Sequence, residues 1–276
     1  MEEHLSQLTH WFNHVFGPIA LYVLHALGLQ PADYEHPIPE YIVMSLTVFV
    51  IGTIFALIVR SRLSVERPGA IQQLGELLLT NPLGFGIVDL LDENVAHGAR
   101  KYVSFVGSIS IFILLSNLLS VFPAFSAPTA IVVVPLACAV LTFLYFNWQG
   151  LRHSGVGGYL LTFAGSPKSV GDWALAVLLF PVELISTGAR VLSLTVRLWA
   201  NIFASDLLYA IFLSLLVKLT FFAWGKFVVL GAVLAILPLT IPLAFIGLHI
   251  FVAIIQAYVF TVLPAIYLGI ATADEH

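Results

Sequence analysis

Two long apolar runs in the C-terminal half of the chain restrict its fold most strongly. The first extends from about Trp173 to Val217 and the second from about Phe227 to Ala271, roughly 45 residues each. One helix of that length would measure about 67 Å, more than twice the thickness of a bilayer core of about 30 Å. Each run therefore forms either a hairpin of two spans or a single strongly tilted helix. The absence of a polar turn signal at the middle of either run favours the tilted helix.

The composition of the whole chain predicts an integral membrane protein. Of the 276 residues, 60% are hydrophobic and only 9% are charged, whereas about a quarter of the residues in soluble domains are charged. The net charge of -4 argues against a nucleic-acid partner. Cys138 is the only cysteine, which excludes a disulfide or a cysteine redox pair within the chain, and we expect no metal site and no cofactor.

Three shorter apolar segments precede the long runs, so we expect an all-α protein with about five membrane helices and additional interfacial helices. The N-terminal residues 1–40 are predicted to form an external or interfacial segment and residues 41–276 the membrane domain. A polar, glycine-rich loop is expected after Trp148, and a short connection at Lys218–Lys226. The shorter predicted spans are Tyr41–Val59, Val103–Phe122 and about Ala130–Trp148, and the predicted interfacial segments are Leu8–Leu29 and a whole or broken helix over residues 70–95.

The distribution of basic residues predicts the orientation. If each apolar segment crosses once, Lys218 and Lys226 lie on one side and a larger basic set lies on the other. Cytoplasmic loops carry the excess of lysine and arginine, so we expect the N-terminus outside and the C-terminus in the cytoplasm. The larger set is Arg60, Arg62, Arg67, Arg100, Lys101, Arg152 and Lys168.

A polar stripe occupies one face of the fourth long helix. Its members are separated by steps of seven, three, four and four residues, which a helix brings to the same side. Arginine stays protonated in proteins, and a charge at the bilayer centre costs roughly 2.5–3.5 kcal/mol on insertion scales. The stripe is therefore expected to face a protein interface or an aqueous cavity. It consists of Glu183, Arg190, Ser193, Arg197 and Asn201.

Further polar residues lie at other depths. Asp206 is about half a turn from Arg197 and roughly 13 Å further toward the outside, whereas Glu183 is roughly 21 Å toward the cytoplasm. His249 and Gln256 are seven residues apart and share a face of the last helix. If the two long helices are antiparallel, Gln256 lies near the level of Arg197 and His249 nearer Asp206.

Simpler structural roles are open for each of these residues. Glu183 and Arg190 can neutralise each other, and Asp206 can pair locally. Asn201 and Gln256 can join helices by hydrogen bonds, and His249 can be a buried imidazole with satisfied nitrogens. His10 and His14 have the i, i+4 spacing of metal ligands without an evident third ligand, so we expect them at an interface.

The residues from Arg190 to Asp206 (Arg-Val-Leu-Ser-Leu-Thr-Val-Arg-Leu-Trp-Ala-Asn-Ile-Phe-Ala-Ser-Asp) resemble the signature of subunit a of bacterial F-type ATP synthases. Asn117–Pro123 with Pro128-Thr129, the segment Gly150–Tyr159, and the last helix with its Tyr-Leu-Gly-Ile-Ala-Thr ending resemble other parts of the family, whereas residues 1–40 give no match. The chain has Asp206 where the family often has glutamate, and Ala200 and Ser205 where it often has glycine.

The resemblance implies a stator subunit of the F0 membrane sector, in the bacterial inner membrane, whose last two helices wrap against a rotating ring of c subunits. It implies that Arg197 faces the ring carboxylate. The outer half-channel and centre would contain Asn201, Asp206, His249 and Gln256, and the cytoplasmic half-channel would contain Glu183, Arg190 and Ser193. The implied partners are the c-ring, the b subunits, the F1 head and membrane lipid, and ATP chemistry would belong to partner subunits.

The mechanism expected from these residues is indirect proton transfer. A proton enters near Asp206 and His249, neutralises a ring carboxylate, travels with the ring and leaves through the cytoplasmic cleft. The fixed charge of Arg197 favours the ionised form of a carboxylate beside it and blocks a direct path between the clefts. The alternatives are a stand-alone secondary transporter, a sodium-translocating version of the same subunit and a purely structural anchor.

Overall fold

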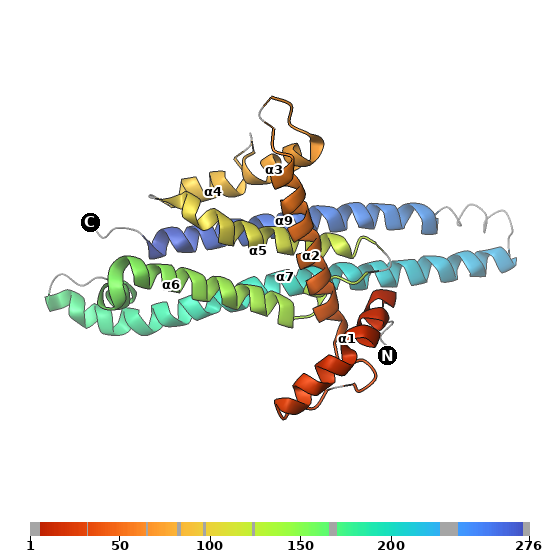
Figure 1. The fold of residues 1–276 in the computed structure, drawn as a ribbon, viewed down its shortest axis with the longest axis horizontal. Helices are drawn as coiled ribbons and strands as arrows, with labels where there is room; N and C mark the ends of the chain where they lie inside the picture. The colour runs from red at the N-terminus through yellow and green to blue at the C-terminus, as the bar shows by residue number, and fades with distance from the viewer. Residues whose placement is uncertain are drawn as a thin grey trace. The chain divides into compact units, whose positions relative to one another are not determined.

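The computed structural model describes residues 6–31, 33–64, 66–81, 84–95, 98–122, 125–165, 170–226 and 237–272. Every regular element in these residues is helical, which confirms the predicted all-α class. Figure 1 shows the helices in chain order. Their bounds are α1 Gln7–Ala26, α2 Glu40–Ser61, α3 Ala70–Leu79, α4 Ile87–Asn94, η1 Ala99–Tyr102, α5 Val103–Leu119, η2 Pro128–Ala130, α6 Val133–Phe163, α7 Val170–Lys226 and α9 Leu237–Ala271.

Five helical segments among the described residues are long and apolar enough to cross a membrane, as predicted. They are Glu40–Ser61, Ala99–Leu119, Val133–Phe163, Asp172–Phe222 and Leu243–Ala271. The polar stretch around residues 70–95 forms the two short helices α3 and α4, which confirms a broken helix there. The helix predicted over Leu8–Leu29 is α1.

In their described parts, the two long apolar runs form continuous helices rather than hairpins. α7 extends over 57 residues and α9 over 35 residues. The predicted connection at Lys218–Lys226 is wrong, because α7 continues through it to Lys226. Leu219 to Trp224 contain no proline or glycine, so the two lysines do not interrupt the helix. Residues 227–236, where the last helix was predicted to begin, lie outside the described residues.

The predicted loop after Trp148 is also wrong, because α6 continues to Phe163 with a kink. The kink is at Gly155, which has φ 69° and ψ 170°, a backbone conformation that glycine adopts without steric cost. The ring of Tyr159 packs directly on Gly150, and its hydroxyl donates a hydrogen bond of 2.9 Å to Asn147 Oδ1. Glycines in this segment thus permit a bend and a close approach inside a helix. Lys168, Pro123 and the tail Ala273–His276 lie outside the described residues.

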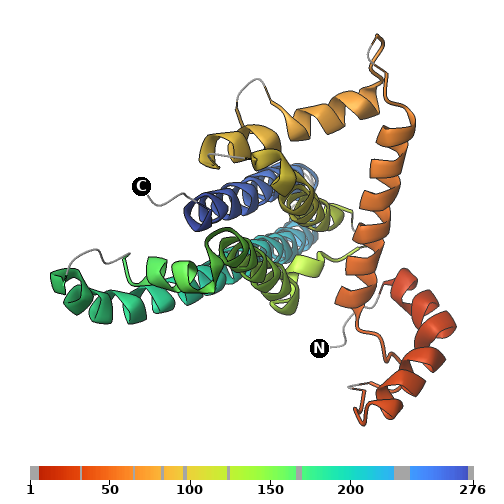
Figure 2. The same ribbon diagram turned by 60° about the vertical axis from the view of Figure 1, so that its left-hand side comes forward.

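The chain divides into two compact units. Unit 1 consists of Met1–Val50, Leu114–Ile131 and Leu198–Ile255. Within it, the later part of α7 and the first part of α9 lie side by side (Figures 1 and 2), and the Phe212 and Phe245 rings are 5.1 Å apart. Asn13 in α1 holds the segment before α2 through two hydrogen bonds with the backbone of Ile38, at 3.0 Å and 2.9 Å.

Unit 2 consists of Ile51–Ile113, Val132–Arg197 and Gln256–His276. Its apolar core joins α4, η1, α5, α6 and the end of α9. The core residues are Ile87, Leu91, Val95, Ala99, Tyr102, Val106, Phe146, Ala265 and Leu268. Close helix approach supports this core, because a side chain at Gly269 of α9 would collide with the Asn94 carbonyl oxygen of α4.

Gly269→Ala tests this contact. We expect the added methyl group to separate α9 from α4 and to lower the free energy of unfolding by about 1–3 kcal/mol. Thermal denaturation of the purified full-length chain in detergent is the measurement. Gly247→Ala in the same helix is the control, because nothing lies within 4 Å of its added carbon. Equal stability of the Gly269 and Gly247 variants would contradict the packing argument.

Candidate functional site

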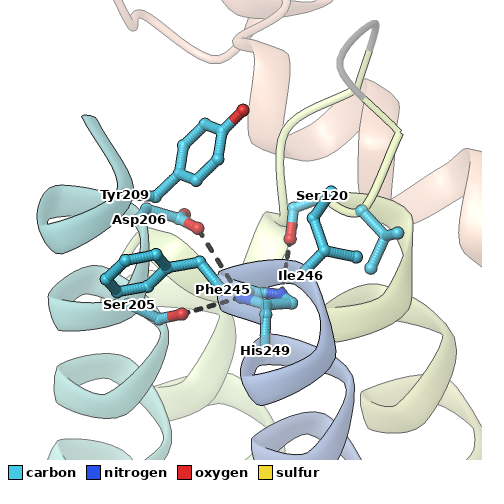
Figure 3. A pocket seen from close by; sticks show the side chains of 8 residues that line it. Ser120, Ser205, Asp206, Tyr209, Phe245, Ile246 and His249 are labelled. Atoms are coloured by element: carbon cyan, nitrogen blue, oxygen red, sulfur yellow. Dashed lines mark hydrogen bonds and ion pairs between the residues drawn. The ribbon is translucent and has the colours of Figure 1, made fainter. Parts of the chain in front are cut away.

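A polar cluster around His249 (His249, Ser205, Asp206, Ser120 and Asn117) lies within unit 1. The His249 side chain projects from α9 between α7 and the end of α5 (Figure 3). It is 7% exposed. Its Nδ1 lies 2.9 Å from Ser205 Oγ and 3.9 Å from Asp206 Oδ1. Its Nε2 lies 2.9 Å from Ser120 Oγ and 3.0 Å from the Asn117 carbonyl oxygen.

A cavity of about 110 Å³ opens beside this cluster. His249 and Asp206 both line this cavity, together with other polar side chains and with apolar ones. The lining residues are Ser120, Val121, Ser205, Asp206, Tyr209, Phe245, Ile246 and His249 (Figure 3). A buried imidazole and a carboxylate around one cavity can exchange protons with each other and with molecules that enter it.

An arginine–glutamate cluster (Glu183, Arg190, Tyr159 and Tyr267) lies within unit 2. Arg190 Nη2 is 2.9 Å from Glu183 Oε1, so the two charges neutralise each other, as the simpler alternative held. The Arg190 guanidinium also lies over the Tyr267 ring, 4.8 Å from its centroid, in a cation–π contact. A cavity of about 380 Å³ adjoins them, lined by Phe146, Tyr159, Thr162, Phe163, Glu183, Thr187, Arg190, Tyr267, Ile270 and Ala271.

Arg197 differs from Arg190 in its surroundings. Its side chain is exposed, as are those of Ser193 and Asn201 in the same stripe. Its contact with Ser193 Oγ is long, at 3.4 Å. Among the described residues, no carboxylate forms an ion pair with Arg197. This chain therefore contributes no counter-charge to Arg197 in its described part.

Gln256 is buried, with 2% of its surface exposed. Its Oε1 accepts no hydrogen bond from any described residue, including Arg197. An unpaired buried polar atom costs about 1–3 kcal/mol, so this amide oxygen has an unused capacity to accept a hydrogen bond. Among the described residues, Gln256 Oε1 therefore does not join two helices by a hydrogen bond, which was one of the simpler roles left open for Gln256.

The N-terminal histidines form a separate chain of polar contacts. His10 Nδ1 lies 3.0 Å from His36 Nε2, and His36 Nδ1 lies 3.3 Å from Asp33 Oδ2. The structure thus brings His10 to His36, a residue that the sequence analysis did not single out. The Glu35 backbone N–H donates to Asp33 and is the largest cause that lowers the pKa of this carboxyl group.

Sequence reasoning predicted that His249 would lie near Asp206, and the structure brings them together. It did not identify Ser120, Asn117, Tyr159 or Tyr267 as site residues. Ser205 was noted only as a departure from the usual glycine. These residues come from other helices, and only the segments that resemble the family gave any signal for them in the sequence.

Comparisons with known proteins identify the family. A sequence model of the family described as ATP synthase A chain matches residues 41–269. The chain is 36% identical to ATP synthase subunit a of Koribacter versatilis (strain Ellin345), with 96% of this chain and 98% of the relative covered. It is 39% identical to ATP synthase subunit a of Solibacter usitatus (strain Ellin6076), with 91% and 93% covered.

A third relative, ATP synthase subunit a of Campylobacter jejuni (strain ATCC 700819 / NCTC 11168), is 31% identical over 88% of this chain and 94% of the relative. Because the Koribacter alignment covers 96% of this chain, it includes most of the first 40 residues. The similarity therefore reaches into the N-terminal segment, where the sequence analysis found no match. With five apolar helices and these matches, the chain is a multi-pass bacterial membrane protein that belongs to the ATP synthase A chain family.

Proposed function

We propose that this chain is the proton-translocating stator subunit of an F-type ATP synthase. In this function, two offset half-channels exchange protons with carboxylates on a rotating c-ring. The relatives named ATP synthase subunit a support the general role. The observation that carries the specific mechanism is the charge of Arg197 on an exposed face of α7, which forms no ion pair with any described residue.

Arg190 and Arg197 lie on the same helix but differ in their contacts, and this difference supports a partner for Arg197 from another subunit. Arg190 has an ion pair and a cation–π contact within its own chain. Arg197 has only a long contact with Ser193 among the described residues. An arginine charge in an apolar span requires compensation, so a carboxylate from another subunit is the chemically matched partner.

The rest of α7 has the character of a surface that another protein or lipid covers. Only 6% of the most apolar part of the span Asp172–Phe222 is buried, against 44% for Ala99–Leu119. Large apolar side chains such as Leu192, Val196 and Phe203 are exposed beside the stripe. A ring of apolar helices, each with one carboxylate, would cover this surface and pair with Arg197.

The His249 cluster is the proposed outer half-channel. Asp206 and His249 line the same cavity, and carboxylates and imidazoles are common relay groups in membrane proton pathways. Asn201 and Gln256 are proposed to line the path near its centre, where the unpaired Gln256 Oε1 would accept a hydrogen bond. The imidazole favours protons over sodium as the transported ion, because hard cations prefer oxygen ligands.

The Arg190 cluster is the proposed cytoplasmic half-channel. The Glu183 carboxylate lines its cavity and would accept protons released by the ring. Its ion pair with Arg190, at 2.9 Å, holds the carboxylate at this cavity. Ser193 lies on the same helix face between Arg190 and Arg197 and would extend the polar surface toward the ring.

The topology proposed for this function has the N-terminus outside and the C-terminus in the cytoplasm. Residues 1–40 would be an external or interfacial segment, and residues 41–276 the membrane domain. The c-ring, the b subunits and the F1 head are the proposed partners, and ATP synthesis itself would occur in the head. Co-purification with a ring and an ATPase head is the expected result, whereas a chain that purifies alone and transports ions would favour a secondary transporter.

Arg197→Ala tests the central step. We expect ATP synthesis by the assembled complex in liposomes to fall to background, because the ring carboxylate loses its counter-charge and the two half-channels lose their separation. Lys218→Ala is the matched control, since Lys218 is an exposed basic residue on the same helix outside the stripe. Synthesis at the wild-type rate in assembled Arg197→Ala complex would overturn the mechanism.

Asp206→Asn tests the outer half-channel. The amide keeps the shape of the side chain but cannot carry the proton, so we expect ATP-driven proton pumping to slow by roughly tenfold to 100-fold with normal assembly. Asp206→Glu retains the carboxylate and is expected to keep most of the activity. Proton flux equal to wild type in the Asn variant would remove Asp206 from the path.

A further inference from the structure

We infer that the Asn117 backbone carbonyl, held in place by Thr129, fixes neutral His249 as the Nε2–H tautomer and makes Nδ1 its proton-exchanging nitrogen. The inference deepens the proposed function and rests on it for its role in proton transfer. The tautomer itself follows from hydrogen-bond geometry within unit 1. Asn117 and Thr129 are positioning residues, since neither is in contact with the cavity that lies beside Asp206.

The Nε2 side of the imidazole faces a group that can only accept. The Asn117 carbonyl oxygen lies 3.0 Å from Nε2. The Ser120 hydroxyl donates to the same oxygen at 3.1 Å, which turns a lone pair of Ser120 Oγ toward Nε2 at 2.9 Å. A proton on Nε2 satisfies both contacts. The other tautomer would oppose two lone pairs at 3.0 Å, which is repulsive.

The end of α5 makes this carbonyl available. Asn117 is in the last turn of a helix that ends at Leu119, where backbone carbonyls lack the usual helical partner. The Val121 N–H donates to the Leu118 oxygen at 3.2 Å instead of continuing the α-helical pattern to Asn117. His249 and Ser120 therefore supply the hydrogen bonds to the Asn117 carbonyl oxygen at the helix end, and these bonds orient Nε2 of the imidazole toward that oxygen.

Thr129 fixes the residue that carries this carbonyl. The Thr129 hydroxyl, in η2, donates a hydrogen bond of 2.6 Å to Asn117 Oδ1. Both side chains are fully buried, so water does not readily replace this bond if it is lost. The link ties η2 to the end of α5 and restricts the rotation of the Asn117 peptide plane.

The Nδ1 side faces the cavity and its ionisable groups. Nδ1 lies 2.9 Å from Ser205 Oγ and 3.9 Å from Asp206 Oδ1, and Tyr209 of α7 also lines the cavity. With Nδ1 unprotonated, the Ser205 hydroxyl donates to it. A proton that arrives from the cavity binds the Nδ1 lone pair, and the resulting Nδ1–H donates to Ser205 Oγ until the proton leaves by the same nitrogen.

This arrangement makes His249 a side branch of the path rather than a link through it. A proton that crossed the ring from Nδ1 to Nε2 would meet the Asn117 carbonyl oxygen, which only accepts hydrogen bonds, or Ser120, which lines the same cavity. His249 therefore takes protons from the cavity and returns them to the same cavity. Ser205 and Asp206 are the groups that pass protons onward.

The test is the nitrogen NMR spectrum of His249 in the full-length chain. The chain is labelled with ¹⁵N-histidine, reconstituted in lipid bilayers, and compared by subtraction with His249→Gln at a pH where neutral imidazole is present. We expect the His249 signals of an Nε2–H tautomer, with Nδ1 at the position of an unprotonated nitrogen. Thr129→Val should reduce the preference for this tautomer by about tenfold, since one buried hydrogen bond is lost.

Thr129→Ser is the conservative control, because it keeps the donor to Asn117 Oδ1 and should restore the wild-type spectrum. An Nδ1–H tautomer, or an even mixture, in the wild-type chain overturns the inference. A wild-type tautomer preference in folded Thr129→Val overturns the role of Thr129. If the valine variant does not fold, the wild-type spectrum still decides the tautomer. Since no transport is measured, a failure of the proposed function would appear in the Arg197→Ala assay and not in this spectrum.

Discussion

The compensation of arginine charge in an apolar helix governs the organisation of α7. A guanidinium in a membrane span must find an anion, an aromatic face or water. Arg190 has both an anion, the Glu183 carboxylate, and an aromatic face, the Tyr267 ring, within its own chain. Arg197 finds neither among the described residues and projects from an exposed face. Arg190 and Arg197 are two turns apart, and of the two only Arg190 is compensated within the described residues. Arg197 is the position where we propose that a second subunit supplies the counter-charge.

α7 contributes residues to two polar clusters, which are held together by different kinds of interaction. In the His249 cluster, short hydrogen bonds from α5 and α7 orient an imidazole that carries no obligatory charge. In the Arg190 cluster, an ion pair with Glu183 and a cation–π contact with Tyr267 hold a permanently charged guanidinium. In the proposed function, the first cluster would relay protons and the second would contain an acceptor for them. Each cluster adjoins a cavity of its own unit.

The sequence predicts the helices far better than the contacts between them. The five spans follow from the length of apolar runs, and the continuity of α7 follows from the absence of turn signals. The loop after Trp148 was wrongly predicted because its glycines are turn formers by propensity, whereas within α6 only Gly155 leaves the helical conformation. The partners of His249 could not be predicted by periodicity, because Asn117 and Ser120 are separated from it by 132 and 129 residues. Such contacts depend on which helices become neighbours, which a helical pattern in one segment does not specify.

Two departures from the family pattern complement each other in the structure. Asp206 stands where the family often has glutamate, and its carboxylate oxygen stops 3.9 Å from His249 Nδ1, beyond hydrogen-bond distance. Ser205 stands where the family often has glycine, and its hydroxyl lies 2.9 Å from the same nitrogen. A glutamate has one more methylene group and would reach further toward the imidazole without help. With the shorter acid, the Ser205 hydroxyl supplies the direct contact with His249 that the Asp206 carboxylate lacks.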